Sequence, residues 1–364
     1  MKKLTTGYII LETGEIFSGK LIGKVKRSAG EIVFNTSMTG HQHILTNPSY
    51  TGQIIVFSYP VIGGYRIRSK ENKTKKIYAQ GVVIKEICNV PSYDPLAISM
   101  ESVLEKDNIP CLTEVDTRAL IKTIRKRGTV KAVISDDMND KPETNTSFKP
   151  VNKVSTKTVI QYTNDVNAPH IVIVDFGVEQ EIVQYFINAN CRVTLVPYDY
   201  SFENILQLKP DGIVLSNGPG DPMDLIDEIE KIYKLSTLFP TLGISLGHQL
   251  VALAYGAKTE ALPFGHRGGN YPVKDLRTGK VYITTQNHGY TVIDQTIDRN
   301  EFNISYQNVN DGSIEGIEHK QKPIQTVQFY PDTVFPSQME TGHIFHSFLE
   351  TVNKNTGVMS YAVK

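Results

Sequence analysis

The second half of the chain alternates short, continuous apolar runs with segments whose apolar residues recur at helical spacing. The apolar runs are "HIVIVDFG", "CRVTLVPYD", "DGIVLSNGPGDP" and "PTLGIS", and the helical segments are "VEQEIVQYFINAN", "MDLIDEIEKIYKLS" and "GHQLVALAYG". Strands that are apolar on both faces and alternate with helices are typical of a parallel sheet covered on both sides. We therefore predict a doubly wound, mostly parallel α/β domain over residues 168–355, with its functional groups at the carboxyl ends of the strands.

The first 135 residues have a different pattern. Short β-rich runs such as "EIVFNTSM" and "GQIIVFSYP" are separated by turns rich in Gly, Pro, Asn and Ser. The segment "VDTRALIKTIRKRG" is predicted to be a helix, because Leu120, Ile121 and Ile124 share one side and Gly128 ends the pattern. We predict a separate N-terminal α+β or β-rich domain at residues 1–135 and a polar linker at residues 136–167.

Length and charge narrow the class of protein. A chain of 364 residues is longer than the roughly 250–300 residues at which single cores stop growing, so two domains are expected. Its 38 Lys and Arg balance its 38 Asp and Glu, which argues against nucleic acid or an acidic membrane surface as a partner. The start, "MKKLTTGYIILETGEIF", has an apolar run too short for a signal peptide or a membrane span, so we expect a cytoplasmic protein.

The three cysteines suggest no metal or redox chemistry. Cys88, Cys111 and Cys191 are far apart and form no C-x-x-C pair. Free cysteine behaves mainly as a small hydrophobic residue, so we expect reduced thiols and no metal site in this chain.

One short motif raises the question of catalysis. Residues 243–247, Gly-Ile-Ser-Leu-Gly, match the G-x-S-x-G turn that presents a serine nucleophile after a strand. Acyl transfer also needs a base, a group that orients the base, and backbone N–H donors for the oxyanion. The turn at Gly218 and Gly220 is a candidate for such a donor, because glycine lets the backbone approach a substrate closely.

Several further motifs, taken in their order along the chain, resemble those of a known family. The second half contains "NGPG", "GISLGHQ", "FGHRGGNYPV", "TTQNHGYTV" and "TVQFYPD", and it resembles a class I glutamine amidotransferase domain. The first half contains "GEIVFNTSMTGHQHILTNPSYTGQIIVFSYPVIGGY" and "VDTRALIKTIRKRGT". With these segments, nearly the whole chain resembles the carbamoyl phosphate synthase small-subunit family.

The resemblance implies a function and a partner. In this family the small subunit hydrolyses L-glutamine, and the ammonia passes through a tunnel to a large subunit. The large subunit makes carbamoyl phosphate from bicarbonate and two ATP, for arginine and pyrimidine synthesis. The resemblance thus implies no cofactor in this chain, with ATP and magnesium on the large subunit.

The residues that hold glutamine in the family are intact here. They are Ser49, Gly218, Gly220, Leu246, Gln249, Asn287, Gly289 and Tyr290. The catalytic triad is different, because Ser245 stands where the family has cysteine, and Tyr330 and Asp332 stand where it has histidine and glutamate. A serine hydroxyl stays protonated near neutral pH and depends on a base, and a phenol of ordinary pKa near 10 is a poor one. We expect weak or absent glutaminase activity.

Other histidines do not obviously replace the missing base. His248 adjoins Ser245 but points along the following helix in the family motif, and His343 or His346 would have to approach from the C-terminal helix. Surface or packing roles are the commoner case for such histidines.

Four functions therefore remain open. The leading one is a small subunit that docks on a large subunit, binds glutamine and has lost most of its glutaminase step. A second is an active serine-based glutaminase with an unrecognised base, and a third is a non-enzymatic glutamine sensor or scaffold. A serine esterase of the α/β-hydrolase kind is the least favoured, because no proper Asp-then-His pair follows the G-x-S-x-G turn and the rest of the chain resembles another family.

Overall fold

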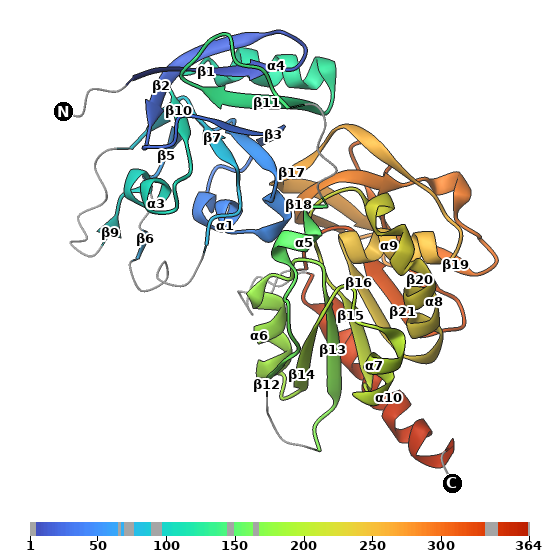
Figure 1. Cartoon of the computed structure of the whole chain (residues 1–364). Coiled ribbons are helices and arrows are strands. Elements are labelled where there is room, and N and C mark those ends of the chain that lie inside the picture. Colours follow the sequence, from blue (N-terminus) through green and yellow to red (C-terminus); the bar gives the residue numbers. More distant parts are fainter. Residues whose placement is uncertain are drawn as a thin grey trace. The chain divides into compact units, whose positions relative to one another are not determined.

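The computed structural model describes residues 5–64, 67–68, 76–88, 97–143, 149–162, 167–331 and 341–362. The chain divides into two compact units (Figure 1): Met1–Phe148 with Leu262–Gly268, and Lys149–Ala261 with Gly269–Lys364. None of the helices within the described ranges combines the length and hydropathy that a membrane span requires.

The first unit contains a closed barrel with the strand order β1-β11-β3-β4-β7-β10-β2. Its strands are β1 (Thr5–Leu11), β2 (Ile16–Ile22), β3 (Ser28–Asn35), β4 (Gln53–Phe57), β7 (Gly81–Val83), β10 (Cys111–Thr113) and β11 (Val130–Ser135). Strand β4 is buried on both faces, because Ile54 and Val56 join one apolar cluster while Ile55 and Phe57 join another.

Helices and short strands complete this unit: α1 (His41–Leu45), η1 (Pro48–Tyr50), β5 (Val61–Ile62), β6 (Ile67–Arg68), β8 (Glu86–Ile87), β9 (Ala97–Ile98), α3 (Met100–Lys106) and α4 (Thr117–Arg127). Helix α4 confirms the predicted helix. It begins where the Asp116 side chain accepts a hydrogen bond from the Ala119 N–H, and it ends at Gly128, whose φ is 85°. Its buried residues are Thr117, Leu120 and Ile124.

The second unit is built on a ten-stranded sheet with the order β12-β14-β13-β15-β16-β21-β20-β19-β17-β18. The bounds are β12 (Ile160–Tyr162), β13 (His170–Asp175), β14 (Arg192–Pro197), β15 (Gly212–Leu215), β16 (Thr241–Ile244), β17 (Thr259–Asp275), β18 (Val281–Val292), β19 (Phe302–Asn308), β20 (Ile314–His319) and β21 (Ile324–Val327). Strands β14, β13, β15, β16 and β21 pair in parallel. This parallel centre confirms the predicted fold class.

Helices lie on both faces of this sheet (Figure 1). They are α5 (Val151–Val154), α6 (Gln180–Asn188), α7 (Phe202–Gln207), η2 (Pro222–Glu228), α8 (Ile229–Leu238), α9 (Leu246–Ala254), η3 (Asp294–Thr296) and α10 (His343–Ala362). Ile171 and Ile173 of β13 pack with α6 and α10, whereas Val172 and Val174 pack with α8 and α9. The alternation of β13 therefore separates two core layers.

Two features differ from the predicted domain boundaries. Residues 136–167, predicted as a linker, include α5 and β12. Strand β12 pairs with β14 in antiparallel register, so this part of the segment belongs to the sheet of the second unit. Leu262–Gly268 also belongs to the first unit, although the residues on both sides of it belong to the second.

Candidate active site at the carboxyl ends of the parallel strands

Ser245 occupies a sharp turn between β16 and α9. Its φ is 54° and its ψ is −106°, a backbone conformation that non-glycine residues rarely adopt. The Ser245 N–H donates to the Val327 carbonyl at 2.8 Å, and the Ser245 carbonyl accepts from the Gln249 N–H at 3.2 Å. A strained strand-to-helix turn of this kind is the geometry in which a nucleophile is presented above a sheet.

The glycines on either side of Ser245 are required by close packing. A Cβ atom on Gly247 would lie 2.2 Å from the Leu215 carbonyl oxygen, and one on Gly243 would lie 2.8 Å from the Gly247 carbonyl oxygen. The Gly247 N–H also donates to the Ser216 carbonyl at 3.1 Å. The start of α9 therefore passes directly over the end of β15, which accounts for both glycines of the motif.

The loop after β15 lies beside this turn. A Cβ on Gly218 would be 2.4 Å from the Phe176 carbonyl oxygen and 2.9 Å from Leu246 Cδ2, so Gly218 and Leu246 are neighbours. Gly220 has a φ of 101°, which favours glycine. Buried side chains hold the loop: Ser216 Oγ donates to the Asn217 carbonyl at 2.8 Å, and Asn217 Nδ2 donates to the Gly177 carbonyl at 2.9 Å.

Gln249 joins α9 to two other segments of the predicted pocket. Its Nε2 donates to the Tyr290 carbonyl of β18 at 2.9 Å and to Gln328 Oε1, also at 2.9 Å. His288 supports the same carbonyl, since its Nδ1 lies 2.7 Å from the Tyr290 oxygen. The structure thus brings Gln249 and Tyr290 together.

A buried polar network lies behind this strand. His288 Nε2 is 2.8 Å from Gln286 Oε1, and Gln286 Nε2 donates to Glu315 Oε2 at 2.8 Å. Asn308 Nδ2 donates to the other carboxylate oxygen of Glu315 at 3.0 Å. Asn287 and Gly289 flank His288 on β18, and the network fixes the strand that carries them. Sequence reasoning did not single out Gln286, Glu315 or Gln328, although Gln328 stands in the "TVQFYPD" motif.

The remaining triad positions are only partly described. Tyr330 is 9% exposed, and its N–H donates to the Thr285 carbonyl at 3.1 Å. It follows β21, the parallel neighbour of β16, in which Val327 pairs with Ile244. Asp332 lies outside the described residues.

The histidines proposed as alternative bases make other contacts. His248 Nδ1 lies 2.7 Å from Thr326 Oγ1, and complete burial lowers the pKa of His248 to about 3. His343 Nε2 lies 3.0 Å from the Tyr306 hydroxyl, and His346 lies 3.2 Å from the Glu350 carboxylate.

Ser49 belongs to the first unit. It lies in η1, where its N–H donates to the Asn47 side chain at 2.8 Å, and it is 4% exposed. Its part in glutamine binding stays a prediction.

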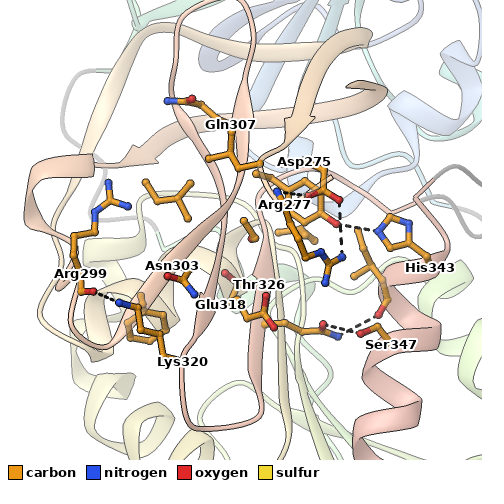
Figure 2. Close-up of a pocket in the computed structure, with 18 of the residues that line it drawn as sticks. Asp275, Arg277, Arg299, Asn303, Gln307, Glu318, Lys320, Thr326, His343 and Ser347 are labelled. Carbon is orange, nitrogen blue, oxygen red and sulfur yellow. Dashed lines mark hydrogen bonds and ion pairs between the residues drawn. The ribbon is translucent and has the colours of Figure 1, made fainter. Parts of the chain in front are cut away.

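A separate cavity of about 640 Å³ lies in the second unit, beside the first turn of α10. Figure 2 shows Asn303, Glu318 and Thr326 in the middle of its lining, with His343 and Ser347 on one side and Arg299 and Lys320 on the other. Neither Ser245 nor any of the predicted glutamine-binding residues lines it. The cavity is therefore distinct from the strand-end site.

Comparison with known proteins gives the family. The glutamine amidotransferase class-I family matches residues 172–351, and the carbamoyl-phosphate synthase small chain, CPSase domain family matches residues 9–134. The carbamoyl phosphate synthase arginine-specific small chain of Halalkalibacterium halodurans is 42% identical, over 98% of this chain and 99% of that one. The arginine-specific small chain of Bacillus subtilis is 44% identical, over 95% of this chain and 97% of that one.

Bacillus subtilis has a second protein that is similar to this chain. Its pyrimidine-specific small chain is 42% identical, over 94% of this chain and 95% of that one. Identity at this level over nearly the full length of both chains, from three relatives with the same kind of name, identifies the chain as a member of the carbamoyl phosphate synthase small chain family.

Proposed function

We propose that this protein is a glutamine-binding small subunit of a carbamoyl phosphate synthase whose own glutaminase step is weak or lost. The observation that carries the proposal is the turn at Ser245. The turn has the geometry of a nucleophile turn and lies beside the Gly218 loop. It presents serine, however, where the family has cysteine. A large subunit is the proposed partner, L-glutamine the proposed ligand, and the cytoplasm the proposed location.

The chemistry of the three replaced residues supports the loss of activity. A thiol can be ionised by a neighbouring histidine, whereas the Ser245 hydroxyl needs a base to remove its proton. Tyr330 supplies a phenol, and Asp332 has no imidazole at position 330 to orient. Active sites that keep an oxyanion site but lose triad members retain an acceleration of about 10³–10⁴ over water. The complex would then depend on free ammonia.

The binding positions support retained affinity for glutamine. Gly218 and Leu246 are neighbours, and Gln249 is hydrogen-bonded to the strand that carries Asn287, Gly289 and Tyr290. Backbone N–H and C=O groups at such positions can hold an amide and an α-amino acid group. We further propose that the product serves arginine or pyrimidine synthesis, since relatives of both names are similar to this chain.

Three assays test the proposal: glutamine binding and glutamine hydrolysis by the purified full chain, each with and without a candidate large subunit, and carbamoyl phosphate formation with that subunit present. We expect calorimetry to detect glutamine binding, glutamine hydrolysis to stay near background, and carbamoyl phosphate to form from ammonium salts but not from glutamine. Loss of glutamine binding would overturn the proposal.

The strained turn at Ser245 also favours a second candidate, an active serine-based glutaminase. Rapid glutamine turnover by the unmodified chain that is abolished by Ser245→Ala would establish that function instead.

A further inference from the structure

The cavity beside α10 has one wall made of polar side chains from three adjacent strands. Asn303 of β19 pairs with Glu318 of β20, and Glu318 pairs with Gln325 of β21. Residues that lie directly opposite on neighbouring strands point to the same face of a sheet, so these three side chains form one row. The cavity volume of 640 Å³ is typical of small-molecule sites, which measure roughly 300–1,000 Å³.

Two carboxylates of the lining have unused hydrogen-bonding capacity. The Asp275 side chain is 3% exposed, and its Oδ1 accepts from the Arg277 and Thr278 N–H groups at 2.8 and 3.2 Å. Its Oδ2 has no hydrogen-bond partner among the described residues, since the Arg277 guanidinium lies 3.9 Å away. The exposed Glu318 carboxylate forms no hydrogen bond or ion pair with any residue that the structure describes. Both groups can therefore accept a donor from a ligand.

Both carboxylates also act on one buried hydroxyl group, that of Tyr306. Burial raises the pKa of Tyr306, and the negative charges of Asp275 and Glu318 raise it further, whereas the Arg277 charge opposes them. The same hydroxyl lies 3.0 Å from His343 Nε2. Coulombic effects weaken with distance and are screened over about 10 Å, so one small ligand can reach both carboxylates.

One cation of the lining lacks an ionic partner. The Arg299 guanidinium pairs with the Asp294 carboxylate, whereas the Lys320 ammonium donates to the Arg299 carbonyl oxygen at 2.5 Å. An ammonium has three N–H groups, and the charge of Lys320 is not paired with any carboxylate in the described part of the chain. Figure 2 shows Asp275 and Lys320 on opposite sides of Glu318.

We propose that this cavity binds a basic amino acid. Glu318 and Lys320 are two residues apart and project from the same side of the chain, so they hold the α-ammonium and the α-carboxylate. The side-chain cation extends to the other side of the cavity and donates to Asp275 Oδ2. A neutral amino acid has no second charge for Asp275, and a simple amine has no carboxylate for Lys320.

Calorimetry on the full chain tests the proposal with three probes. L-arginine, whose guanidinium offers the most N–H groups, is expected to bind once per chain with a dissociation constant of about 1 mM or less. L-citrulline has nearly the same shape but a neutral side chain, and agmatine lacks the α-carboxylate. Each should bind about tenfold more weakly, the size of one lost hydrogen bond to a charged group.

Three variants assign the contacts. Glu318→Gln removes a charge that contacts no described residue, so it should fold normally and weaken L-arginine binding about tenfold. Lys320→Met should weaken L-arginine by a similar factor without weakening agmatine, because agmatine has no carboxylate. Asp275→Asn keeps an oxygen for the Arg277 and Thr278 N–H groups and should abolish the preference for L-arginine over L-citrulline.

Glu350→Gln serves as the matched control. Glu350 belongs to the same helix as His343 and contacts His346, but it does not line the cavity. The affinity for L-arginine should stay within about twofold of that of the unmodified chain.

Several results would overturn the proposal. They are no saturable binding of L-arginine up to about 10 mM, equal affinity for L-citrulline or agmatine, undiminished binding to Glu318→Gln, and an equal loss in Glu350→Gln. None of them bears on glutamine binding, because no predicted glutamine-binding residue lines this cavity.

Discussion

Ser245 combines a preserved backbone with a changed functional group. Its left-handed φ of 54° is held by the hydrogen bond to Val327, so the turn does not depend on which small side chain it carries. The substitution Ser245→Cys would supply only the sulfur nucleophile and neither of the other two triad groups. An ordinary cysteine is only a few per cent thiolate at pH 7, and nothing would protonate the leaving ammonia.

We therefore expect Ser245→Cys to hydrolyse glutamine little faster than the unmodified chain. The triple variant Ser245→Cys, Tyr330→His and Asp332→Glu should recover measurable turnover, because residues that act as a unit have non-additive effects. Ammonia release in a coupled assay, with Ser245→Ala as the blank, measures both. Full recovery by the single cysteine variant would show that a base other than residue 330 serves the site.

His248 makes the stability of the second unit depend on pH. Burial lowers its pKa to about 3 in the folded chain, below the ordinary value of 6.5. The unfolded chain therefore binds a proton below pH 6.5 that the folded chain does not, and the free energy of unfolding falls as the pH drops from 6.5 toward 3. Between pH 6.5 and 4.5 this residue is expected to remove about 2–3 kcal/mol.

Urea unfolding at pH 7, 5.5 and 4.5 measures this loss. His248→Gln removes the titrating group and can still hydrogen-bond Thr326, so its free energy of unfolding should fall less steeply with acid. Parallel pH profiles for the two proteins would rule out His248 as a source of the acid sensitivity.

Among the elements, the buried parallel strands were the easiest to predict. Strand β13 is apolar at Ile171–Val174 on both faces, a pattern typical of a parallel strand that is covered on both sides. Strand β12 was missed because "IQY" is only three residues long and follows a polar stretch, and only its pairing with β14 defines it. The long strands β17 and β18 were also not anticipated, since their burial is irregular along their length.

In the candidate site, too, some residues could be predicted from the sequence and others could not. The glycines and Ser245 were found because their motif reflects backbone geometry that any helix passing over a strand end requires. Gln286 and Glu315 act through side-chain hydrogen bonds that join β18, β19 and β20, and Gln328 acts through one that joins the segment after β21 to α9. Pairings of that kind depend on register between distant strands, which local pattern does not specify.

The crossing of α9 over β15 provides a test at this scale. Gly247→Ala would place a Cβ 2.2 Å from the Leu215 carbonyl oxygen, so the helix must shift, although alanine favours helices in general. We expect a loss of about 1–3 kcal/mol in the free energy of unfolding. Gly64→Ala is the control, because a Cβ there meets nothing within 4 Å. Equal stabilities would contradict the close packing of α9 on β15.

At the scale of the whole molecule, the first unit is not continuous in sequence. Phe264 of the Leu262–Gly268 segment packs on Phe34 with ring centroids 5.8 Å apart. The Arg125 guanidinium lies 5.2 Å from the centre of the Phe264 ring. Arg267 is almost fully buried and lies 3.5 Å from the Glu31 carboxylate. The barrel thus depends on a segment more than a hundred residues beyond its last strand.

A fragment of residues 1–148 should consequently be less stable than the same fragment with residues 262–268 attached through a flexible linker. We expect the attached segment to raise the melting temperature by about 5 °C or more, because it restores an aromatic contact and covers apolar surface. Thermal denaturation followed by circular dichroism checks this. Replacing Phe264 by Ala in the longer fragment should remove most of the gain, and identical melting temperatures would mean that the segment is dispensable.

The same segment affects the order of events during synthesis. Domains generally fold one after another as the chain leaves the ribosome, beginning at the N-terminus. Here the barrel strands end at Ser135, but the first unit acquires Phe264 and Arg267 only after strands β12 to β16 of the second unit have been made. The nascent N-terminal unit therefore cannot be completed, and the apolar surface around Phe34 stays uncovered, until most of the parallel strands of the second unit have been synthesised.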